Sequence, residues 1–171
     1  MAGEMMEYDG LVGRFFFKRI LQKAVEISEI GLNETVLDFG CERQELKKFL
    51  PKSADYVGFD IEERFSDIAA IEGLKDVDTV FALNVLEHLQ SEQELERVLK
   101  VFKNIGAKKL IVALPRNDII SQLLKLPTKY DATTFFYHLL DSRQIVRVIS
   151  KVWGRQQQAV RVNLIQYLAR Y

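Results

Sequence analysis

The sequence predicts an α/β fold with three layers: a mostly parallel sheet, an antiparallel C-terminal strand, and helices on both faces. Three observations support this prediction. Short apolar runs alternate with helical segments through residue 114, as in repeated βα units. The chain has 171 residues, of which 48% are hydrophobic and only three are prolines, enough for the core of a single domain. The final segment, 156–171, alternates apolar and polar residues well enough for two short strands.

The first helix is expected over residues 11–30, where apolar residues recur at helical spacing before Gly31. Its Phe15-Phe16-Phe17 run is flanked by basic residues, which would also suit a helix lying on a membrane surface. Three consecutive phenylalanines cannot share one helix face, however, because successive residues point in different directions. We therefore favour packing of this helix against the core.

Four buried strands are expected at residues 35–39, 56–59, 79–83 and 110–114, which are short apolar runs bounded by turn residues. A short helix over 43–50 would be closed by Pro51.

The connection between the second and third of these runs is short. Only 17 residues separate Asp60 from Asp78. We expect this region to be abbreviated, with its helix reduced to a turn and an extra strand reduced to a stub at 64–66.

Two further helices have clear start signals. Ser91 and Glu94 have the spacing of a capping box, in which each side chain satisfies a free backbone amide, and this helix ends at Gly106. A second helix is expected over 142–152, with Asp141 as its cap and Gln144 at the reciprocal position.

Charge is unevenly distributed along the chain. The 24 basic and 24 acidic side chains cancel, which argues against a histone-like nucleic-acid binder. Residues 1–100 nevertheless hold 12 basic and 21 acidic side chains, whereas residues 101–171 hold 12 and 3. The sequence alone leaves open whether these two halves form opposed surfaces.

Several classes of protein are excluded or disfavoured. One cysteine, Cys41, excludes an intramolecular disulfide and a cysteine zinc knuckle, and two histidines argue against a His-rich metal site. No metal is therefore predicted. The start of the chain does not resemble a signal peptide, and no apolar run approaches the ~20 residues of a membrane span. We expect a cytoplasmic protein without a membrane span.

Polar residues follow the first two strands at their carboxyl ends. The run Val36-Leu37-Asp38-Phe39-Gly40 leads into a helix, so its amides could face an anionic group while Gly40 permits close approach of a ligand. Asp60 ends the next strand, the arrangement in which nucleotide sites hold both ribose hydroxyls. Asp38 or Asp60 alone could equally cap a loop. Together they indicate a nucleotide-type site.

Three segments, VLDFGC, YVGFDI and DTVFALNVLEHL, occur in the order of the first, second and fourth motifs of class I S-adenosylmethionine-dependent methyltransferases. The chain resembles that family, near the branch whose fourth strand runs into VLEHL. The resemblance implies a Rossmann-like sheet and S-adenosylmethionine as the small-molecule methyl donor. It further implies one methyltransferase-like domain over residues 1–171: an N-terminal helix (1–31), a donor-binding half (32–114), and acceptor-side helices with C-terminal strands (115–171).

The resemblance also implies roles for individual residues. Asp38 would help hold the amino-acid end of the donor, with Gly40 beneath it. Asp60 would bind the ribose hydroxyls, and Asp67 in a short third motif would contact the adenine amino group. The implied donor-binding residues are Asp38, Gly40, Cys41, Glu42, Asp60, Ile61, Asp67, Asn84 and Val85.

The first motif departs from the family pattern Asp-x-Gly-x-Gly-x-Gly. Glu42 and Gln44 stand where the second and third glycines are usual. A side chain at Glu42 would restrict the backbone, and its charge would repel the donor's carboxylate unless it turned to the donor's ammonium. These replacements argue against tight donor binding.

No catalytic residue can be assigned from the sequence. His88 is the one candidate general base, but the resemblance favours a structural role for Glu87 and His88 in a short helix. Cys41 is interpreted as a packing residue rather than a nucleophile, because no histidine lies near it in sequence. The aromatic-rich segment 119–138 lies where family members build the acceptor pocket, or else it merely covers the sheet.

Two functions therefore remain. The first is a methyltransferase whose unidentified acceptor lies over the basic half, which would suit an anionic acceptor such as a nucleic acid, a phosphorylated metabolite or an acidic headgroup. The alternative is a non-catalytic methyltransferase-like partner or regulatory subunit that has lost tight donor binding. A nicotinamide dehydrogenase is disfavoured, because the Gly-x-Gly-x-x-Gly fingerprint is missing.

Overall fold

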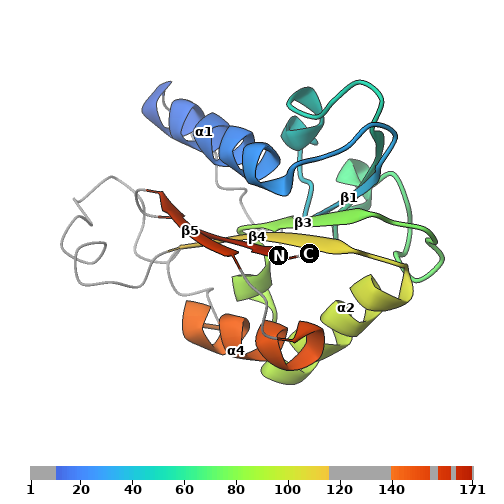
Figure 1. Cartoon of the computed structure of the whole chain (residues 1–171), viewed down its shortest axis with the longest axis vertical. Helices are drawn as coiled ribbons and strands as arrows, with labels where there is room; N and C mark the ends of the chain where they lie inside the picture. The colour runs from blue at the N-terminus through green and yellow to red at the C-terminus, as the bar shows by residue number, and fades with distance from the viewer. Residues whose placement is uncertain (1–10, 116–139, 155–157, 163–164, 171) are drawn as a thin grey trace.

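The computed structural model describes residues 11–115, 140–154, 158–162 and 165–170 (Figure 1). In it, short 3-10 turns (η) occur among the helices and strands. The elements in chain order are α1 (Leu11–Ser28), β1 (Thr35–Phe39), η1 (Glu45–Lys48), β2 (Asp55–Phe59), η2 (Glu63–Phe65), β3 (Thr79–Leu83), η3 (Leu86–His88), α2 (Glu92–Asn104), β4 (Lys109–Pro115), α4 (Ser142–Trp153), β5 (Gln158–Val162) and β6 (Ile165–Arg170).

The strands form one sheet in the order β2-β1-β3-β4-β6-β5. The first four are parallel, with Asp38 of β1 opposite both Gly58 of β2 and Phe81 of β3. β6 runs antiparallel to β4 and to β5. The predicted α/β class with a mostly parallel sheet is confirmed. Because β2 and β3 lie on opposite sides of β1, the chain order reverses beside β1, the place where such sheets bind ligands.

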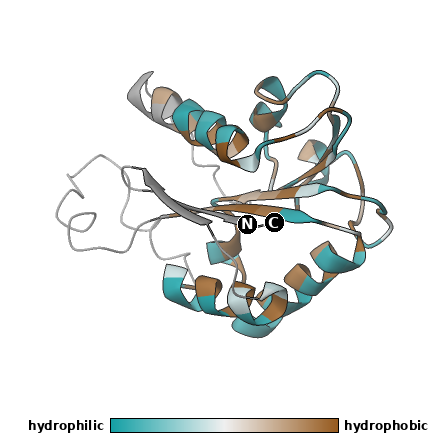
Figure 2. Ribbon diagram, in the orientation of Figure 1, coloured by the Kyte–Doolittle hydropathy of each residue, from teal (hydrophilic) through white to brown (hydrophobic). Residues whose placement is uncertain are grey.

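Helices cover both faces of the sheet (Figure 1). α1 lies on one face, and α2 and α4 lie on the other. Alternate residues of each strand point to opposite faces, so neighbours in sequence enter different cores. The α1 side buries Ile20, Leu21, Ala24, Val36, Phe81, Ile111 and Ala113, whereas the opposite side buries Leu37, Val80, Leu95, Leu99, Phe102, Val112, Ile145 and Ile149. Figure 2 shows apolar residues on the sides of α2 and α4 that face the sheet.

The packing of α1 agrees with the favoured interpretation of its phenylalanine run. Ile20, Leu21 and Ala24 are fully buried against the sheet, while Phe15 is 64% exposed. Among the described residues, no helix has the length and apolar content needed to cross a bilayer.

Both predicted helix caps are present. The Ser91 hydroxyl accepts a hydrogen bond from the Glu94 amide, although the Glu94 carboxylate reaches the amide of Gln90 rather than that of Ser91. At α4, the Asp141 carboxylate accepts from the Gln144 amide and the Gln144 side chain accepts from the Asp141 amide. Each bond satisfies a backbone donor that the first turn leaves free.

Two short elements differ from the prediction. The helix expected over 43–50 is only the turn η1, which Gln44 precedes in a left-handed conformation. The expected stub strand at 64–66 is wrong, because Glu63–Phe65 forms the turn η2. Asp67 instead provides hydrogen bonds to the edge of β2. The Asp67 amide donates to the Gly58 carbonyl (2.9 Å), and the Asp67 carboxylate accepts from the Gly58 amide (2.8 Å).

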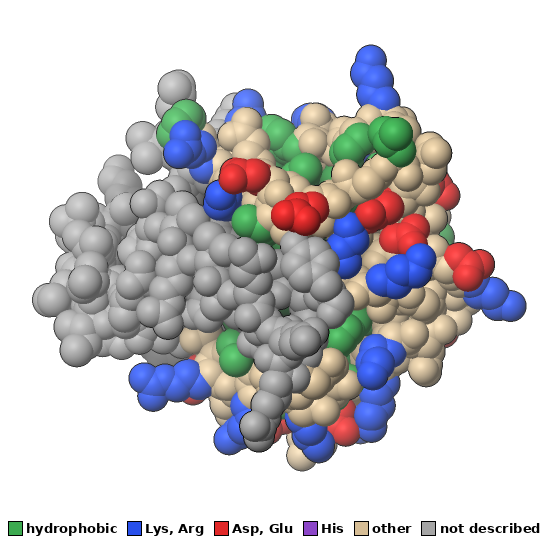
Figure 3. Space-filling model, viewed as in Figure 1, with side chains coloured by type: hydrophobic (Ala, Val, Ile, Leu, Met, Phe, Trp, Pro, Cys, Tyr) green, Lys and Arg blue, Asp and Glu red, His purple; other side chains and the backbone are tan. Residues whose placement is uncertain are grey.

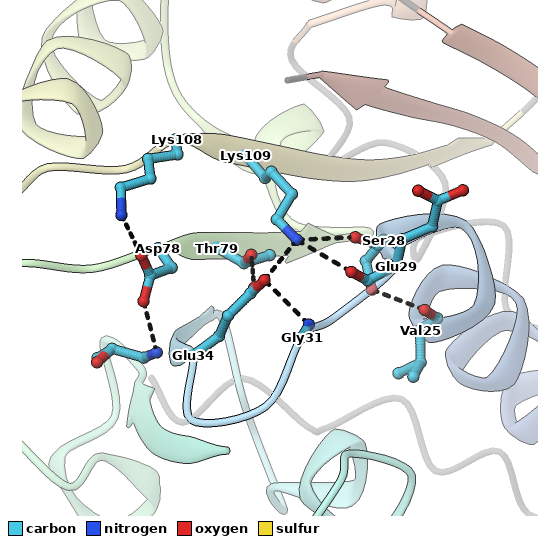
Figure 4. Close-up of polar contacts among 10 residues, drawn as sticks. Val25, Ser28, Glu29, Gly31, Glu34, Asp78, Thr79, Lys108 and Lys109 are labelled. Carbon is cyan, nitrogen blue, oxygen red and sulfur yellow. Dashed lines mark hydrogen bonds and ion pairs between the residues drawn. The ribbon is translucent and has the colours of Figure 1, made fainter. Parts of the chain in front are cut away.

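The acidic and basic halves of the sequence interleave in space. Lys108 and Lys109 bind Asp78 and Glu34 at the amino ends of the parallel strands (Figure 4). Arg147 and Lys151 of α4 pair with Glu92 and Glu96 of α2. Figure 3 accordingly shows charges of both signs mixed across the face in view. Among the described residues, these cations therefore do not form a separate basic surface.

Candidate functional site at the carboxyl ends of β1, β2 and β3

The loop after β1 is fastened to the end of β2. The amides of Gly40 and Cys41 both donate to the Phe59 carbonyl, at 2.8 and 3.1 Å, and the Glu42 amide donates to the Asp60 carboxylate at 2.9 Å. Gly40 has a φ of 81°, and a Cβ there would lie 2.6 Å from Cγ2 of Val85. A glycine is thus required both by the backbone conformation and by contact with the loop after β3.

Glu42 and Gln44 both adopt a backbone conformation that favours glycine. Their φ angles are 39° and 55°, both in the left-handed region. That region costs a non-glycine residue on the order of 1 kcal/mol. The glycine-type course of the loop is therefore retained even though two of the three glycines are absent.

Asp38 is a buried acid beside this loop. It is 5% exposed, and one of its carboxylate oxygens accepts a 2.8 Å hydrogen bond from the Tyr56 hydroxyl. Burial raises the pKa of Asp38 to about 7, and the Asp60 charge adds to that rise while the Tyr56 hydrogen bond opposes it. Near neutral pH, Asp38 can therefore change its charge when a ligand changes its surroundings.

Asp60 joins two loops through its carboxylate. One oxygen accepts from the Glu42 amide (2.9 Å) and the other from the Glu62 amide (3.0 Å). A carboxylate oxygen has two lone pairs, so each still has capacity for one further hydrogen bond. The next residue, Ile61, is 93% exposed.

Asp67, Gln44 and Cys41 form a contact that the sequence did not reveal. The Gln44 side-chain amide donates to the Asp67 carboxylate (2.9 Å) and to the Phe65 carbonyl (3.0 Å), and the Cys41 thiol also donates to Phe65 (3.3 Å). The Gly58 amide and Gln44 lower the pKa of Asp67, whereas burial and nearby carboxylates raise that of Cys41 to about 12. Cys41 is therefore a protonated packing residue at neutral pH.

The segment after β3 carries polar atoms with unusual surroundings. Asn84 has a φ of 53°, and Glu87 is only 2% exposed. The Asn84 Oδ1 and Glu87 Oε2 atoms are buried with no hydrogen-bond partner among the residues that the structure describes. Burial raises the pKa of Glu87 to about 7. By contrast, His88 is exposed.

The fold brings most of the predicted donor-binding residues to one edge of the sheet. Asp38, Gly40, Glu42, Asp60 and Val85 meet where β1, β2 and β3 end. Asp67 lies beside the outer edge of β2, held to Gly58. Within the described parts of the chain, no three His, Cys, Asp or Glu side chains are grouped so that they could hold a metal ion. The predicted acceptor segment 119–138 lies outside the described residues.

Comparison with known proteins supports the class of fold that this geometry indicates. No protein-family model and no curated protein matches the chain. Solved structures of S-adenosylmethionine-dependent methyltransferases do match it over most of its length. The chain has the fold of the class I S-adenosylmethionine-dependent methyltransferases, as the motif order predicted.

Three of these structures illustrate the similarity. The small RNA methyltransferase HEN1 is 23% identical with a TM-score of 0.68, over 90% of this chain and 25% of its own. This chain therefore spans about a quarter of the HEN1 chain. A SAM-dependent methyltransferase from Aquifex aeolicus is 12% identical (TM-score 0.62) and covers 88% of both chains. The N-methyltransferase NodS from Bradyrhizobium japonicum is 13% identical (TM-score 0.59), over 96% of this chain and 98% of its own.

Proposed function

We propose that this protein is an S-adenosylmethionine-dependent methyltransferase whose donor lies over the carboxyl ends of β1 and β2. The observation that carries the proposal is the left-handed backbone at Glu42 and Gln44, with φ angles of 39° and 55°. Side chains disfavour this conformation, so a loop that keeps it without the glycines supports a ligand that requires this course of the backbone. The similarity to NodS, which has been solved with S-adenosyl-L-homocysteine, supports the same donor.

In this proposal the donor follows the loop from β1 to β2. Asp38 and Gly40 lie at its amino-acid end, Asp60 accepts from the ribose hydroxyls, and the exposed side chain of Ile61 covers the adenine. The complete donor site comprises Asp38, Gly40, Cys41, Glu42, Asp60, Ile61, Asp67, Asn84 and Val85. Residues 32–114 form the donor-binding half of one domain, and residues 115–171 form the acceptor side.

The electrostatics of the loop suit a positively charged donor. Desolvation raises the pKa of Glu42, and Asp60 raises it further; the Asp60 charge also raises the pKa of Asp38. These carboxylates therefore repel one another when ionised. The donor's ammonium and sulfonium groups would relieve that repulsion. This argument favours Glu42 turning toward the ammonium rather than facing the donor's carboxylate.

Methyl transfer itself requires little acid-base chemistry from the protein. The acceptor's lone pair forms the new bond to the methyl carbon as the carbon-sulfur bond breaks, and sulfur keeps that bonding pair as a thioether. The contribution of the chain is alignment, since positioning two reactants removes much of the entropic barrier. The Gly40–Val85 contact supports such alignment, because it holds the loop after β3 against the loop after β1.

A non-catalytic partner or regulatory subunit is the second candidate. Both oxygens of Asp67, the residue assigned to the adenine amino group, already accept hydrogen bonds, from Gln44 and from the Gly58 amide. Gln44 thus competes with the donor for this carboxylate, although each of its oxygens keeps one free lone pair. This bond favours a fold that keeps its shape without admitting the donor tightly.

Calorimetric titration with S-adenosylmethionine separates the two candidates. We expect the wild type to bind, and Asp60→Ala to weaken binding by about 1–3 kcal/mol through lost charge-assisted hydrogen bonds. Asp55→Ala is the matched control, because Asp55 is an exposed aspartate at the other end of β2. Circular dichroism verifies that each variant is folded. Undetectable binding at millimolar donor, not restored by Glu42→Gly, would leave the non-catalytic candidate.

A further inference from the structure

Two buried oxygen atoms in the segment after β3 have no partner in the described structure. They are Oδ1 of Asn84 and Oε2 of Glu87, and the Glu87 side chain is fully buried. More than nine in ten buried polar groups in folded proteins are hydrogen-bonded, because an unpaired one costs roughly 1–3 kcal/mol. Two such atoms only three residues apart therefore require an explanation.

Their position associates them with the proposed donor site. Val85, between them in sequence, contacts Gly40 of the donor loop, and the Asn84 amide donates to the Ala113 carbonyl near the end of β4. The main-chain carbonyl of Glu87 accepts from the Leu140 amide, just before α4. The segment thus lies between the donor loop and the acceptor side of the domain, where the methyl group would be transferred.

Packing alone does not account for the two residues. The Glu87 side chain is buried in the turn η3, whose Leu86 belongs to the same core as Leu140 and Ile145. A glutamine would fill the same volume without the cost of ionisation. Asn84 adopts a left-handed backbone, and asparagine tolerates that region better than most residues, but this leaves its carbonyl oxygen unexplained.

We propose that Asn84 Oδ1 and Glu87 Oε2 together bind an amino group of the methyl acceptor, so that the acceptor is an amine. This proposal rests on the methyltransferase function proposed above and names its substrate class. Both atoms are hydrogen-bond acceptors, Glu87 in its ionised form. A primary amino nitrogen carries two hydrogens, or three when protonated, whereas a hydroxyl has only one hydrogen to donate.

The same pair gives the transfer a route for protons. An ammonium has no lone pair, so one N–H proton must leave before the nitrogen can attack. Glu87 in its carboxylate form accepts that proton, and the neutral amine then attacks the methyl carbon while the carbon-sulfur electrons pass to sulfur. The product is the methylated ammonium and the thioether. The raised pKa of Glu87 places its proton affinity close to neutral pH, which suits this exchange.

NMR titration of the full chain tests the proposal with three small ligands that share a butyl group: n-butylamine, n-butanol and butyltrimethylammonium. The third carries the charge but no N–H donor. With ¹³C-labelled glutamate, we expect n-butylamine alone to shift the Glu87 carboxyl resonance and to lower its apparent pKa. Glu87→Gln should weaken n-butylamine binding at least about tenfold. Asn84→Gly, which suits the left-handed backbone, should weaken it less.

The matched control is Glu63→Gln, at an exposed glutamate in η2, which should leave the affinity unchanged. Equal binding of n-butanol or butyltrimethylammonium would overturn the proposal, as would full affinity in Glu87→Gln. Titration with S-adenosylhomocysteine is run in parallel. Amine binding that depends on Glu87 without any binding of S-adenosylhomocysteine would support the amine site and contradict the methyltransferase function. The reverse result would contradict only the amine site.

Discussion

Acidic side chains at the two ends of the parallel strands differ in their pKa shifts: the pKa values of Glu34 and Asp78 at the amino ends are lowered, and those of Asp38 and Glu87 at the carboxyl ends are raised. At the amino ends, Glu34 accepts hydrogen bonds from Lys109, Gly31 and Thr79, and Asp78 accepts from Lys108 and the Thr35 amide (Figure 4). Burial alone would raise the pKa of Glu34, but these bonds outweigh it and lower the pKa, as they do for Asp78. The acids at this end therefore stabilise the fold in their charged form.

At the carboxyl ends the balance is reversed. Asp38 and Glu87 are buried, and burial raises the pKa of each to about 7. Glu42 is also shifted upward, by desolvation and by Asp60. The charged forms of Asp38, Glu42 and Glu87 thus cost stability in the free protein, whereas the Gly58 amide and Gln44 lower the pKa of Asp67 beside β2. The acids at the amino ends thus stabilise the fold, whereas the buried acids at the carboxyl ends destabilise it when charged. This difference is expected if the carboxyl ends form a binding site.

The largest effect that tests this comparison is expected from Asp38→Asn. Because the folded-state pKa lies near 7 and the unfolded value near 4, wild-type stability falls as pH rises from about 4 to 7. The variant lacks this loss. It should match the wild type at pH 4 and exceed it above pH 7 by up to about 4 kcal/mol, from roughly three pKa units. Urea unfolding at several pH values measures the difference, and a destabilised variant at pH 8 would contradict the comparison.

A second test uses one glycine from each end. Gly40→Ala would place a Cβ 2.6 Å from Val85 at a φ of 81°, so overpacking and backbone strain should together cost about 3 kcal/mol. Gly106, before β4, has a φ of 97° but its nearest contact would be 3.4 Å, so Gly106→Ala should cost about 1 kcal/mol. Urea unfolding measures both variants. Equal costs would show that the Gly40–Val85 contact is not tight.

The substitution Lys109→Met tests how much the ion pair with Glu34 at the amino ends of the strands contributes to stability. The Lys109 ammonium binds the Glu34 carboxylate (2.8 Å) and the carbonyls of Ser28 and Glu29, and its side chain is 14% exposed. Its loss leaves a partly buried carboxylate without its cation, at a cost of about 2 kcal/mol. Because the pKa of Glu34 is lowered by folding, this cost should shrink as pH falls below about 4. Lys108→Met, at a 75% exposed lysine, is the control and should change stability less. A cost independent of pH would contradict the role assigned to Glu34.

The strands and helix caps could be predicted because their signals are local. Apolar runs such as 79–83 and the Asp141–Gln144 pair depend only on neighbouring residues. The contact of Gln44 with Asp67 could not be predicted, because it joins residues 23 positions apart in the sequence. The unpaired Glu87 oxygen was missed for a similar reason. The turn that carries Glu87 packs against Leu140 and α4, which are distant in sequence.

The charge pattern shows the same limit. The excess of acids before residue 100 and of bases after it left open whether the two halves form separate surfaces. Ion pairs of Glu34 with Lys109 and of Glu92 with Arg147 bring the halves into contact. Composition gives the number of charges in a segment, whereas the packing of strands and helices determines which charges come into contact. Among the described residues, the remaining asymmetry is therefore between the two ends of the strands.

The smallest effect is expected from Glu42→Gly, and it distinguishes the backbone of the carboxyl end from its charge. Glycine removes about 1 kcal/mol of left-handed strain but adds about 0.5–1 kcal/mol of chain entropy to the unfolded state, so the two nearly cancel. The change in unfolding free energy should stay within about 0.5 kcal/mol at pH 5. At pH 8, loss of repulsion from Asp60 and Glu62 should make the variant slightly more stable than the wild type. A clear loss of stability at both pH values, measured by urea unfolding, would mean that Glu42 supports the fold. In that case its retention would need no ligand to explain it.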